Sequence, residues 1–317
     1  MSPDSSKPLV IMIVGSTGVG KTGLAIELAS AINGEIISAD SRYLYRGMDI
    51  GTAKPSTDER NGIPHHLIDT ADPDQTWTLA DFLDRTLELI EKMVAANKVP
   101  IIVGGTGQYM RALTEGWSIP TFETDENLRR ELNHLADEIG KEQLHQKLAI
   151  VDPEAAGFVD PTNVRRTIRA LEVILSTGQK FSSLRVKEGP AYDFWIIGLC
   201  LERELLYARI DSRIEQMFER GLVDEVKRLL ALGYTPDLPS MSAIGYQEVS
   251  RFLNGDIDLD TAKALMRKRT RQFVRRQTNW FKPTDPSIRW YSMQTNPISD
   301  VIKDLTEYLL MRGHVER

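Results

Sequence analysis

The sequence is poor in cysteine and has no long apolar run. Its 317 residues include a single cysteine, Cys200, so an internal disulfide and a cysteine-rich zinc module are both excluded. The first ten residues, MSPDSSKPLV, are polar and lack the apolar stretch of a signal peptide. No later stretch has the length of a membrane span. We therefore expect a cytoplasmic protein in a reducing compartment, with no membrane partner.

Basic residues are outnumbered by acidic ones, and the formal net charge is -6. This balance disfavours a polyanion partner, because phosphate binding relies on Lys and Arg. The charge is unevenly distributed, however. The stretch from Lys263 to Lys282 holds eight basic residues and no acidic one, which predicts one strongly basic face. These residues are Lys263, Arg267, Lys268, Arg269, Arg271, Arg275, Arg276 and Lys282.

Short apolar runs alternate with helical patterns in the first third of the chain. Leu9–Val14, Glu35–Ala39 and Val99–Val103 are rich in β-branched residues and are typical of buried strands. Helices are expected at Lys21–Ile32 and at Leu79–Ala96. This alternation predicts an α/β fold with a parallel, doubly wound sheet flanked by helices.

The pattern becomes wholly helical from Thr121 to about Thr177, where apolar residues recur at helical spacing. Phe194–Leu199 then returns to a strand pattern, and the remainder is mostly helical, including Arg203–Leu232 and Thr261–Phe281. The sequence therefore predicts an inserted all-helical domain at 121–190, with a core formed by 1–120 and 191–317.

A phosphate-binding loop follows the first strand. The segment GSTGVGKT satisfies G-x-x-x-x-G-K-[ST] in full and lies between a strand and a helix, as this motif requires. Its backbone N–H groups and the start of the helix favour phosphate oxygens, while Thr22 offers a hydroxyl to a phosphate-bound Mg²⁺. We expect a P-loop NTPase-like core that binds a diphosphate or triphosphate. The loop consists of Gly15, Ser16, Thr17, Gly18, Val19, Gly20, Lys21 and Thr22.

The residues after the second strand carry a resemblance to a known family. Ile37–Pro55 reads ISADSRYLYRGMDIGTAKP and resembles the tRNA dimethylallyltransferases, which carry D-S-x-x-x-Y-R-G-M-D-I-G-T-A-K-P there. The likeness continues in the same order through most of the chain. Its further segments are IPHHLID at 63–69, VGGTGQY at 103–109, NVRRTIRALEV at 163–173, SAIGYQE at 242–248 and RRQTNWF at 275–281.

The resemblance implies an activity, its substrates and a cofactor. A dimethylallyl group would pass from dimethylallyl diphosphate to the N6 amino group of the adenosine at position 37, immediately 3′ of the anticodon, in tRNAs that read codons beginning with U. The partners implied are the tRNA anticodon stem-loop and the diphosphate, the cofactor is Mg²⁺, and we expect a monomer. Eukaryotic relatives add a Cys/His zinc finger, which this chain lacks, so a bacterial type is expected. An ATP-binding assignment is common for such loops, but nothing in this reaction consumes ATP.

The resemblance also assigns roles to individual residues. The matching aspartate, Asp40, acts as general base on the adenine amino group, and the matching threonine, Thr106, contacts the tRNA adenosine. Arg129 matches a tRNA-contacting position less securely, because the preceding TFETDEN is one residue longer than the family pattern. The residues that this resemblance places at tRNA are Asp40, Ser41, Arg42, Tyr43, Thr106, Arg129, Arg165, Arg166, Thr167, Ile168 and Arg169.

Three site residues and one helix keep alternative interpretations. Asp40 is favoured as the base, but a carboxylate beside a phosphate loop is also suited to holding Mg²⁺. Arg209 and Arg213 are four residues apart on a helix, so they either clamp the leaving diphosphate or pair with Asp211, Glu215 or Glu219. On the basic helix, we predict an apolar stripe that faces the core, in preference to aromatic rings that serve as stacking platforms, and arginines that face outward toward phosphates. The stripe consists of Leu265, Phe273 and Trp280.

Three other functions fit the same loop. A sister activity prenylates free adenine nucleotides, although the basic clusters oppose it. A small-molecule kinase or NTPase would act on ATP without a prenyl donor, and an RNA-binding module would use the nucleotide as a switch without catalysis.

Overall fold

The chain divides into two compact units in the computed structural model, which describes residues 6–117, 125–183 and 189–313. We call Met1–Thr114 with Ala191–Arg317 the sheet unit, and Glu115–Pro190 the helical unit. The first boundary falls at Glu115 and not at residue 121, because helix α3 (Gly107–Thr114) still belongs to the sheet unit.

The sheet unit is built on one six-stranded sheet with the order β3-β2-β4-β1-β5-β6. Every pairing in it is parallel, as the alternating pattern predicted. The sequence did not predict β3, which is two histidines long, or β6, whose apolar residues lie among polar ones. The strands are β1 (Leu9–Gly15), β2 (Gly34–Ser38), β3 (His65–His66), β4 (Val99–Gly104), β5 (Asp193–Cys200) and β6 (Ile288–Ser292).

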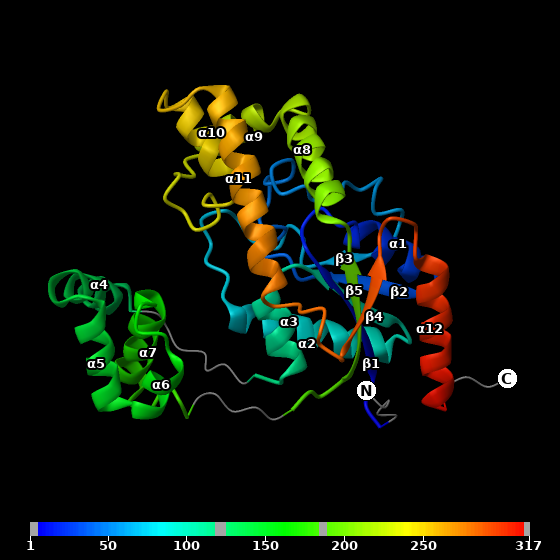
Figure 1. The fold of residues 1–317 in the computed structure, drawn as a ribbon, viewed down its shortest axis with the longest axis horizontal. Coiled ribbons are helices and arrows are strands. Elements are labelled where there is room, and N and C mark those ends of the chain that lie inside the picture. Colours follow the sequence, from blue (N-terminus) through cyan, green and yellow to red (C-terminus); the bar gives the residue numbers. More distant parts are fainter. Residues whose placement is uncertain (1–5, 118–124, 184–188, 314–317) are drawn as a thin grey trace. The chain divides into compact units, whose positions relative to one another are not determined.

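Helices cover both faces of this sheet and extend beyond one end of it (Figure 1). Those of the sheet unit are α1 (Lys21–Ala31), α2 (Leu79–Ala95), α3, α8 (Arg203–Glu219), α9 (Leu222–Ala231), α10 (Tyr246–Leu253), α11 (Leu259–Thr278) and α12 (Ile298–Met311). Those of the helical unit are α4 (Glu126–Ile139), α5 (Lys141–Val151), α6 (Pro153–Phe158) and α7 (Val164–Thr177). None of the described helices is long and apolar enough to cross a membrane.

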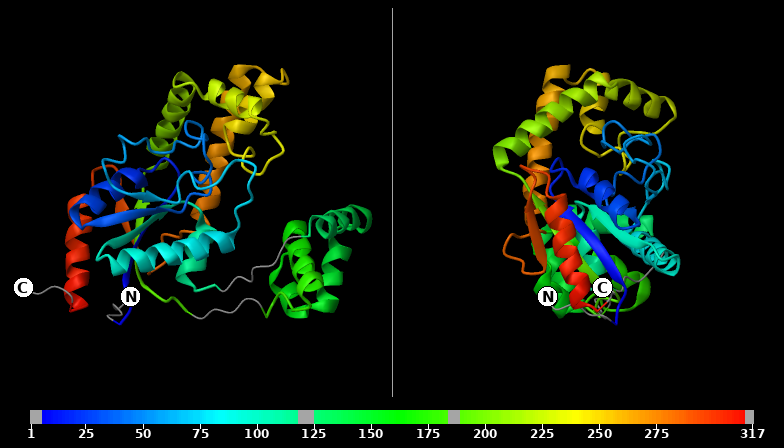
Figure 2. Two further views of the ribbon diagram at one scale, coloured as in Figure 1. Left: turned by 180° about the vertical axis from the view of Figure 1, so that it is seen from behind. Right: turned by 90° about the vertical axis from the view of Figure 1, so that its right-hand side faces the viewer.

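Alternation along β1 divides the core between the two faces of the sheet. Ile11 and Ile13 join the cluster of buried residues that α1 and α12 complete, whereas Met12 between them points to the opposite face. On the first face, α12 packs beside α1, as Figure 2 shows for the red C-terminal helix. Helix α2 packs against β2 and β4. Both faces are therefore buried, which explains why the strands read as continuous apolar runs.

Helices α8 to α11 gather beyond the carboxyl end of the sheet (Figure 1). The sequence predicted helical structure over Arg203–Leu232 without a break, and the structure divides it into α8 and α9 at Gly221. Gly221 has φ 96°, a left-handed conformation that favours glycine and ends the first helix. Helix α11 begins after Asp258, whose side chain accepts a hydrogen bond from the Thr261 N–H as an N-cap.

The helical unit has its own core, formed by the facing sides of α4, α5, α6 and α7. Leu132, Leu144, Leu148 and Leu171 are buried in it. Asn163 caps the start of α7 by accepting a hydrogen bond from the Arg166 N–H. The regular structure of this insertion is all-helical within residues 125–183, as predicted.

A buried carboxylate anchors the loop after β2 to the helices beyond the sheet. Glu225 of α9 is 1% exposed, and its oxygens accept hydrogen bonds from the N–H groups of Asp49, Ile50 and Gly51 at 2.8 to 3.1 Å. The hydroxyl of Tyr246 donates a further hydrogen bond at 2.6 Å. Four donors therefore satisfy one buried charge, and the loop at 49–53 is held in place through its main chain.

We expect Glu225→Gln to lower the free energy of unfolding by about 2 kcal/mol, because the neutral amide loses charge-assisted bonds and turns an N–H₂ group toward backbone donors. Urea unfolding of the whole chain measures this change. Glu219→Gln, at an exposed position on α8, is the matched control and should stay within about 0.5 kcal/mol of the parent. Equal stability of the two variants would show that the anchor does not stabilise the fold.

Candidate active site

The phosphate loop joins β1 to α1 in a conformation that leaves its amides available to an anion. Gly20 is the N-cap of α1 and has φ 109°, in the left-handed region, so it supplies no side-chain cap. The first turn of α1 also holds no acidic residue. The N–H groups at the start of this helix and its positive end are therefore available to a phosphate.

Lys21 supplies the full charge at this loop. Its Nζ donates hydrogen bonds to the carbonyl oxygens of Gly15 and Ser16 at 3.0 and 2.9 Å. Burial lowers the pKa of Lys21 to about 8, while the Asp40 carboxylate opposes this shift and the Arg213 guanidinium adds to it. The ammonium is therefore poorly solvated, and a phosphate would replace the missing water.

Asp40 and Thr106 follow neighbouring strands and meet at the carboxyl edge of the sheet. Asp40 comes two residues after β2, Thr106 comes two residues after β4, and these strands pair in parallel. The Oδ1 of Asp40 accepts a hydrogen bond from the Arg42 N–H at 2.9 Å, and the Thr106 hydroxyl lies 3.5 Å from the Ser41 nitrogen. One carboxylate oxygen thus caps its own turn.

Two cavities meet at Asp40. The first, of about 390 Å³, contains Ser41, Thr106 and side chains of α11. The second, of about 570 Å³, contains Lys21 and Thr22 of the phosphate loop. We call them the acceptor cavity and the donor cavity, after the roles proposed for them below. The residues that line both cavities are Thr17, Asp40, Thr52, Arg213 and Met217.

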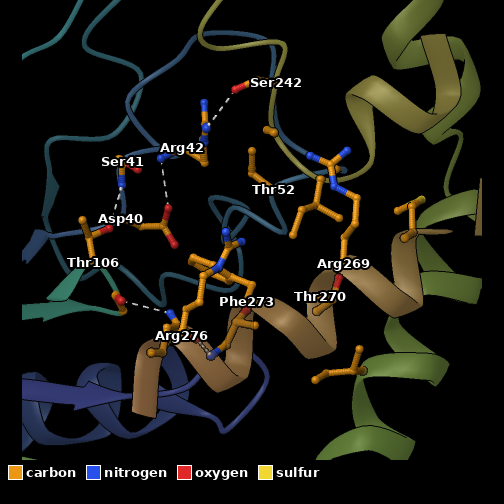
Figure 3. A pocket seen from close by; sticks show the side chains of 18 of the residues that line it. Asp40, Ser41, Arg42, Thr52, Thr106, Ser242, Arg269, Thr270, Phe273 and Arg276 are labelled. Carbon is orange, nitrogen blue, oxygen red and sulfur yellow. Dashed lines mark hydrogen bonds between the residues drawn. The ribbon is translucent and has the colours of Figure 1, made fainter. Parts of the chain in front are cut away.

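Side chains from distant parts of the sheet unit converge on the acceptor cavity. In Figure 3, Asp40 and Thr106 lie on one side of it, and Arg269, Phe273 and Arg276 project from α11 on another. The cavity therefore combines a carboxylate and hydroxyls with an aromatic ring and guanidinium groups, which suits a planar polar ring attached to phosphates.

Ser41, Arg42 and Tyr43 point in different directions. Ser41 and Arg42 line the acceptor cavity, and the Arg42 guanidinium donates to the carbonyl of Pro239 at 2.7 Å and to the hydroxyl of Ser242 at 3.2 Å. Tyr43 instead lines the donor cavity, and its hydroxyl donates to the carbonyl of Ala53 at 2.8 Å. Burial raises the pKa of Tyr43 to about 12, so this phenol stays neutral.

Arg209 and Arg213 face the phosphate loop from α8. Arg209 donates to the carbonyl of Val19 at 3.4 Å, and Arg213 donates to the carbonyl of Ala53 at 3.3 Å. Two of the three carboxylates proposed as their alternative partners bond elsewhere, because Asp211 accepts from Arg271 and Glu215 accepts from Lys263. Both arginines line the cavity that contains the phosphate loop, and the diphosphate clamp stays a prediction.

The basic helix α11 differs from the sequence interpretation in two respects. Four of its basic side chains do not face outward, because they pair with carboxylates of α8 and α10. These pairs are Lys263 and Arg267 with Glu215, Arg269 with Glu248, and Arg271 with Asp211. Lys268, Arg275 and Arg276 are exposed.

The predicted apolar stripe of α11 is also wrong. The buried face consists of Ala262, Met266, Val274 and Gln277. Met266 and Val274 thus take the buried positions one residue after Leu265 and Phe273. Phe273 and Trp280 line the acceptor cavity, and Trp280 is 42% exposed. An aromatic residue counts as apolar whether it packs in the core or lines a cavity, so hydrophobic periodicity cannot distinguish these positions and predicted the core.

The helical unit carries the other residues predicted at tRNA, and it divides them into exposed and buried ones. Arg165 and Arg166 are exposed on α7. Thr167 and Ile168 are 0% and 4% exposed, so a direct side-chain contact with RNA is wrong for these two. Arg129 and Arg169 both pair with Glu172, which is fully buried.

Mg²⁺ would find few protein ligands here. Within the described residues, no three His, Cys, Asp or Glu side chains form a metal-binding group. Thr22 and Asp40 both line the donor cavity, and a hydroxyl and a carboxylate suit Mg²⁺, which keeps most of its shell from phosphate and water. The residues present therefore fit an ion held mainly by the diphosphate.

Comparisons with known proteins identify the family of this chain. The family model described as IPP transferase matches residues 43–284. A tRNA dimethylallyltransferase of Thermomicrobium roseum is 46% identical over 90% of this chain and 86% of its own length, and that of Chloroflexus aggregans is 50% identical over 86% and 92%.

Solved structures give the same family and a P-loop NTPase-like fold. The full-length tRNA isopentenylpyrophosphate transferase of Bacillus halodurans is 38% identical, with a TM-score of 0.72 over 97% of this chain and 98% of its own. A eukaryotic dimethylallyltransferase acting on tRNA is 28% identical, with a TM-score of 0.82 over 96% and 80%. The chain therefore belongs to the IPP transferase family, the tRNA dimethylallyltransferases.

Proposed function

We propose that this chain transfers a dimethylallyl group from dimethylallyl diphosphate to the N6 amino group of adenosine 37, immediately 3′ of the anticodon, in tRNAs that read codons beginning with U. The observation that carries the proposal is the position of Asp40 where the donor and acceptor cavities meet. Family membership supports the reaction, and the two cavities offer separate binding sites for the diphosphate donor and the adenosine acceptor.

The donor diphosphate binds at the phosphate loop. Lys21, the N–H groups of the loop and the start of α1 neutralise its charge, while Arg209 and Arg213 close over it from α8. Mg²⁺ held by the diphosphate and Thr22 would stabilise the charge of the leaving group. This arrangement directs the allylic carbon toward Asp40 and away from the phosphate loop.

The adenine enters the acceptor cavity after leaving the stacked anticodon loop, as base-modifying enzymes require. Thr106 contacts the adenosine from one side, and Phe273 offers an apolar surface from α11. The N6 nitrogen then forms a bond to the allylic carbon while the bond from that carbon to the diphosphate oxygen breaks. Asp40 accepts the proton that the nitrogen loses, so atoms and charges balance.

The partners follow from the same proposal. The anticodon stem-loop contacts Ser41, Arg42 and the exposed arginines of the helical unit, Arg165 and Arg166. Arg129 and Arg169 both form ion pairs with Glu172 and lie beside this surface. Their side chains are 38% and 39% exposed, so they can still contact RNA. The proposal includes a cytoplasmic location, because tRNA is the substrate, and a monomer, because one chain supplies both cavities.

Incubation of the protein with dimethylallyl diphosphate, Mg²⁺ and total tRNA tests the proposal. Mass spectrometry of the digested RNA should show one adenosine that has gained a dimethylallyl group. Modification of free adenine nucleotides in preference to tRNA would indicate the sister activity, and phosphate release from ATP without a prenyl donor would indicate a kinase or NTPase. Binding of tRNA without any transfer would indicate a binding module.

Asp40→Asn should lower the single-turnover rate by roughly 10²- to 10⁴-fold, because the amide keeps the hydrogen bond from Arg42 but cannot accept a proton. Binding of tRNA and donor should change little. Asp74→Asn, at an exposed position after β3, is the matched control. Recovery of the Asp40→Asn rate at high Mg²⁺ would assign Asp40 to the metal, and a rate equal to the parent at every Mg²⁺ concentration would exclude both roles.

Affinity for inorganic diphosphate should fall as pH rises through about 8, where Lys21 loses its proton in the free protein. Only the charged ammonium attracts the anion, so the loss approaches about tenfold per pH unit above this pKa. Lys21→Arg stays charged and should show a weaker pH dependence. Calorimetric titrations at several pH values compare the two proteins, and their ratio cancels the titration of the ligand. Parallel pH profiles would mean that Lys21 does not carry the charge that binds the donor.

Arg165→Ala combined with Arg166→Ala should weaken tRNA binding and reduce the slope of log affinity against log salt by about one for each phosphate that the protein no longer neutralises. Donor affinity should not change. Lys147→Ala, at an exposed position on α5, removes a charge elsewhere on the helical unit and serves as the control. The expected result is a change of slope in the double variant alone. An unaltered slope would identify the two arginines as ordinary solvated charges.

A further inference from the structure

Gln277 bridges two loops of the site from a buried position near the end of α11. Its side chain is 4% exposed. The Oε1 accepts a hydrogen bond from the main-chain N–H of Thr17 in the phosphate loop at 2.8 Å. The Nε2 donates to the main-chain carbonyl of Gly105, immediately before Thr106, at 3.0 Å. One side chain therefore connects the loop after β1 to the loop after β4.

The two partners fix the orientation and the chemistry of this side chain. A main-chain N–H only donates and a carbonyl only accepts, so the amide of Gln277 has one satisfactory orientation. A carboxylate of the same shape would place an oxygen against the Gly105 carbonyl. The approach is also close: a Cβ on Gly105 would lie 2.1 Å from the Gln277 Nε2. The site therefore requires both the amide and the glycine.

The bridge joins the donor cavity to the acceptor cavity. Thr17 lines both cavities, while Gly105 and Thr106 line the acceptor cavity. The Thr17 N–H points to α11 and not to a phosphate, so Gln277 helps to set the path of the phosphate loop. The same helix carries Phe273 in the acceptor cavity. Movement of one loop relative to the other would therefore have to break this bridge.

We propose that Gln277 is a positioning residue that holds the phosphate loop and the Gly105–Thr106 loop at the spacing that transfer requires. The inference rests on the proposed function, because it assumes that the donor and the adenosine occupy these two cavities. Reacting atoms must approach to about 3 to 3.5 Å, and a misplacement of about 1 Å can cost roughly 10²-fold in rate. Gln277 also lines the acceptor cavity, but both polar atoms of its amide are bonded to main-chain groups, so it acts through Thr17 and Gly105.

The first test is Gln277→Ala, assayed for single-turnover transfer to tRNA with both substrates saturating. We expect the rate to fall by roughly 10²-fold, while the dissociation constants for inorganic diphosphate and for tRNA change by less than about threefold. Gln272→Ala, at an exposed position on the same helix, should react like the parent. A parent-like rate for Gln277→Ala, or a defect confined to the dissociation constants, would overturn the proposal.

The second test is Gly105→Ala, which displaces the amide without removing it. Its φ is not in the left-handed region, so alanine meets only the crowding from Gln277 and, at 3.4 Å, the Gly15 carbonyl. We expect a rate loss similar to that of Gln277→Ala, and little further loss when the two changes are combined, because the double variant has room for the Cβ. A rate loss in the double variant equal to the product of the two single losses would contradict the bridge.

Gly105→Ala tests the bridge even if Gln277→Ala is unstable, because this variant keeps the Gln277 side chain and only displaces it. Transfer by the parent protein separates the two proposals. A parent that modifies tRNA, together with fully active variants, would refute the bridge alone. A parent that modifies no tRNA would refute the proposed function and the inference with it.

Discussion

The parallel pairing of β2, β4, β1 and β5 is the constraint on which the site depends. Parallel strands end at the same edge of a sheet, so the phosphate loop after β1, Asp40 after β2 and Thr106 after β4 meet although they are far apart in the sequence. The register leaves little room at this edge, since a Cβ on Gly104 would lie 2.3 Å from the Ala39 carbonyl oxygen. The reacting groups are thus placed by main-chain hydrogen bonds of the sheet.

Buried or shared carboxylates organise the elements beyond the sheet. Glu225 holds the loop at 49–53, Glu215 and Glu248 hold α11, and Glu172 holds two arginines of the helical unit. Removing one partner from such a group exposes the other to an uncompensated desolvation cost, so these contacts specify position more than they add stability. They also explain how an acidic chain of net charge -6 contains a basic helix. Much of the charge of that helix is neutralised within the sheet unit.

Local sequence predicted most of the elements and part of the site. The phosphate loop was predictable because all of its features lie within eight residues and between a strand and a helix. The strand β3 and the break at Gly221 were not, because a two-residue strand has no pattern and a single glycine within an apolar periodicity is a weak signal. Helix α11 shows the same limit, since Phe273 and Trp280 fit a core stripe by spacing and line a cavity in the fold.

The sequence alone determined the fold class, the phosphate site and the family resemblance, because periodicity and contiguous motifs are local properties of a chain. Only the tertiary structure decided which charged side chains remain available to a ligand and which are paired within the protein. It turned Arg209 and Arg213 toward the phosphate loop, paired Arg269 and Arg271 with carboxylates, and buried Thr167 within α7. It also brought Gln277 to Thr17 and Gly105 across 260 and 172 residues. The physical reason is that pairing and burial depend on which elements pack together, and the energy of a charge or an amide is set by neighbours that are distant in sequence.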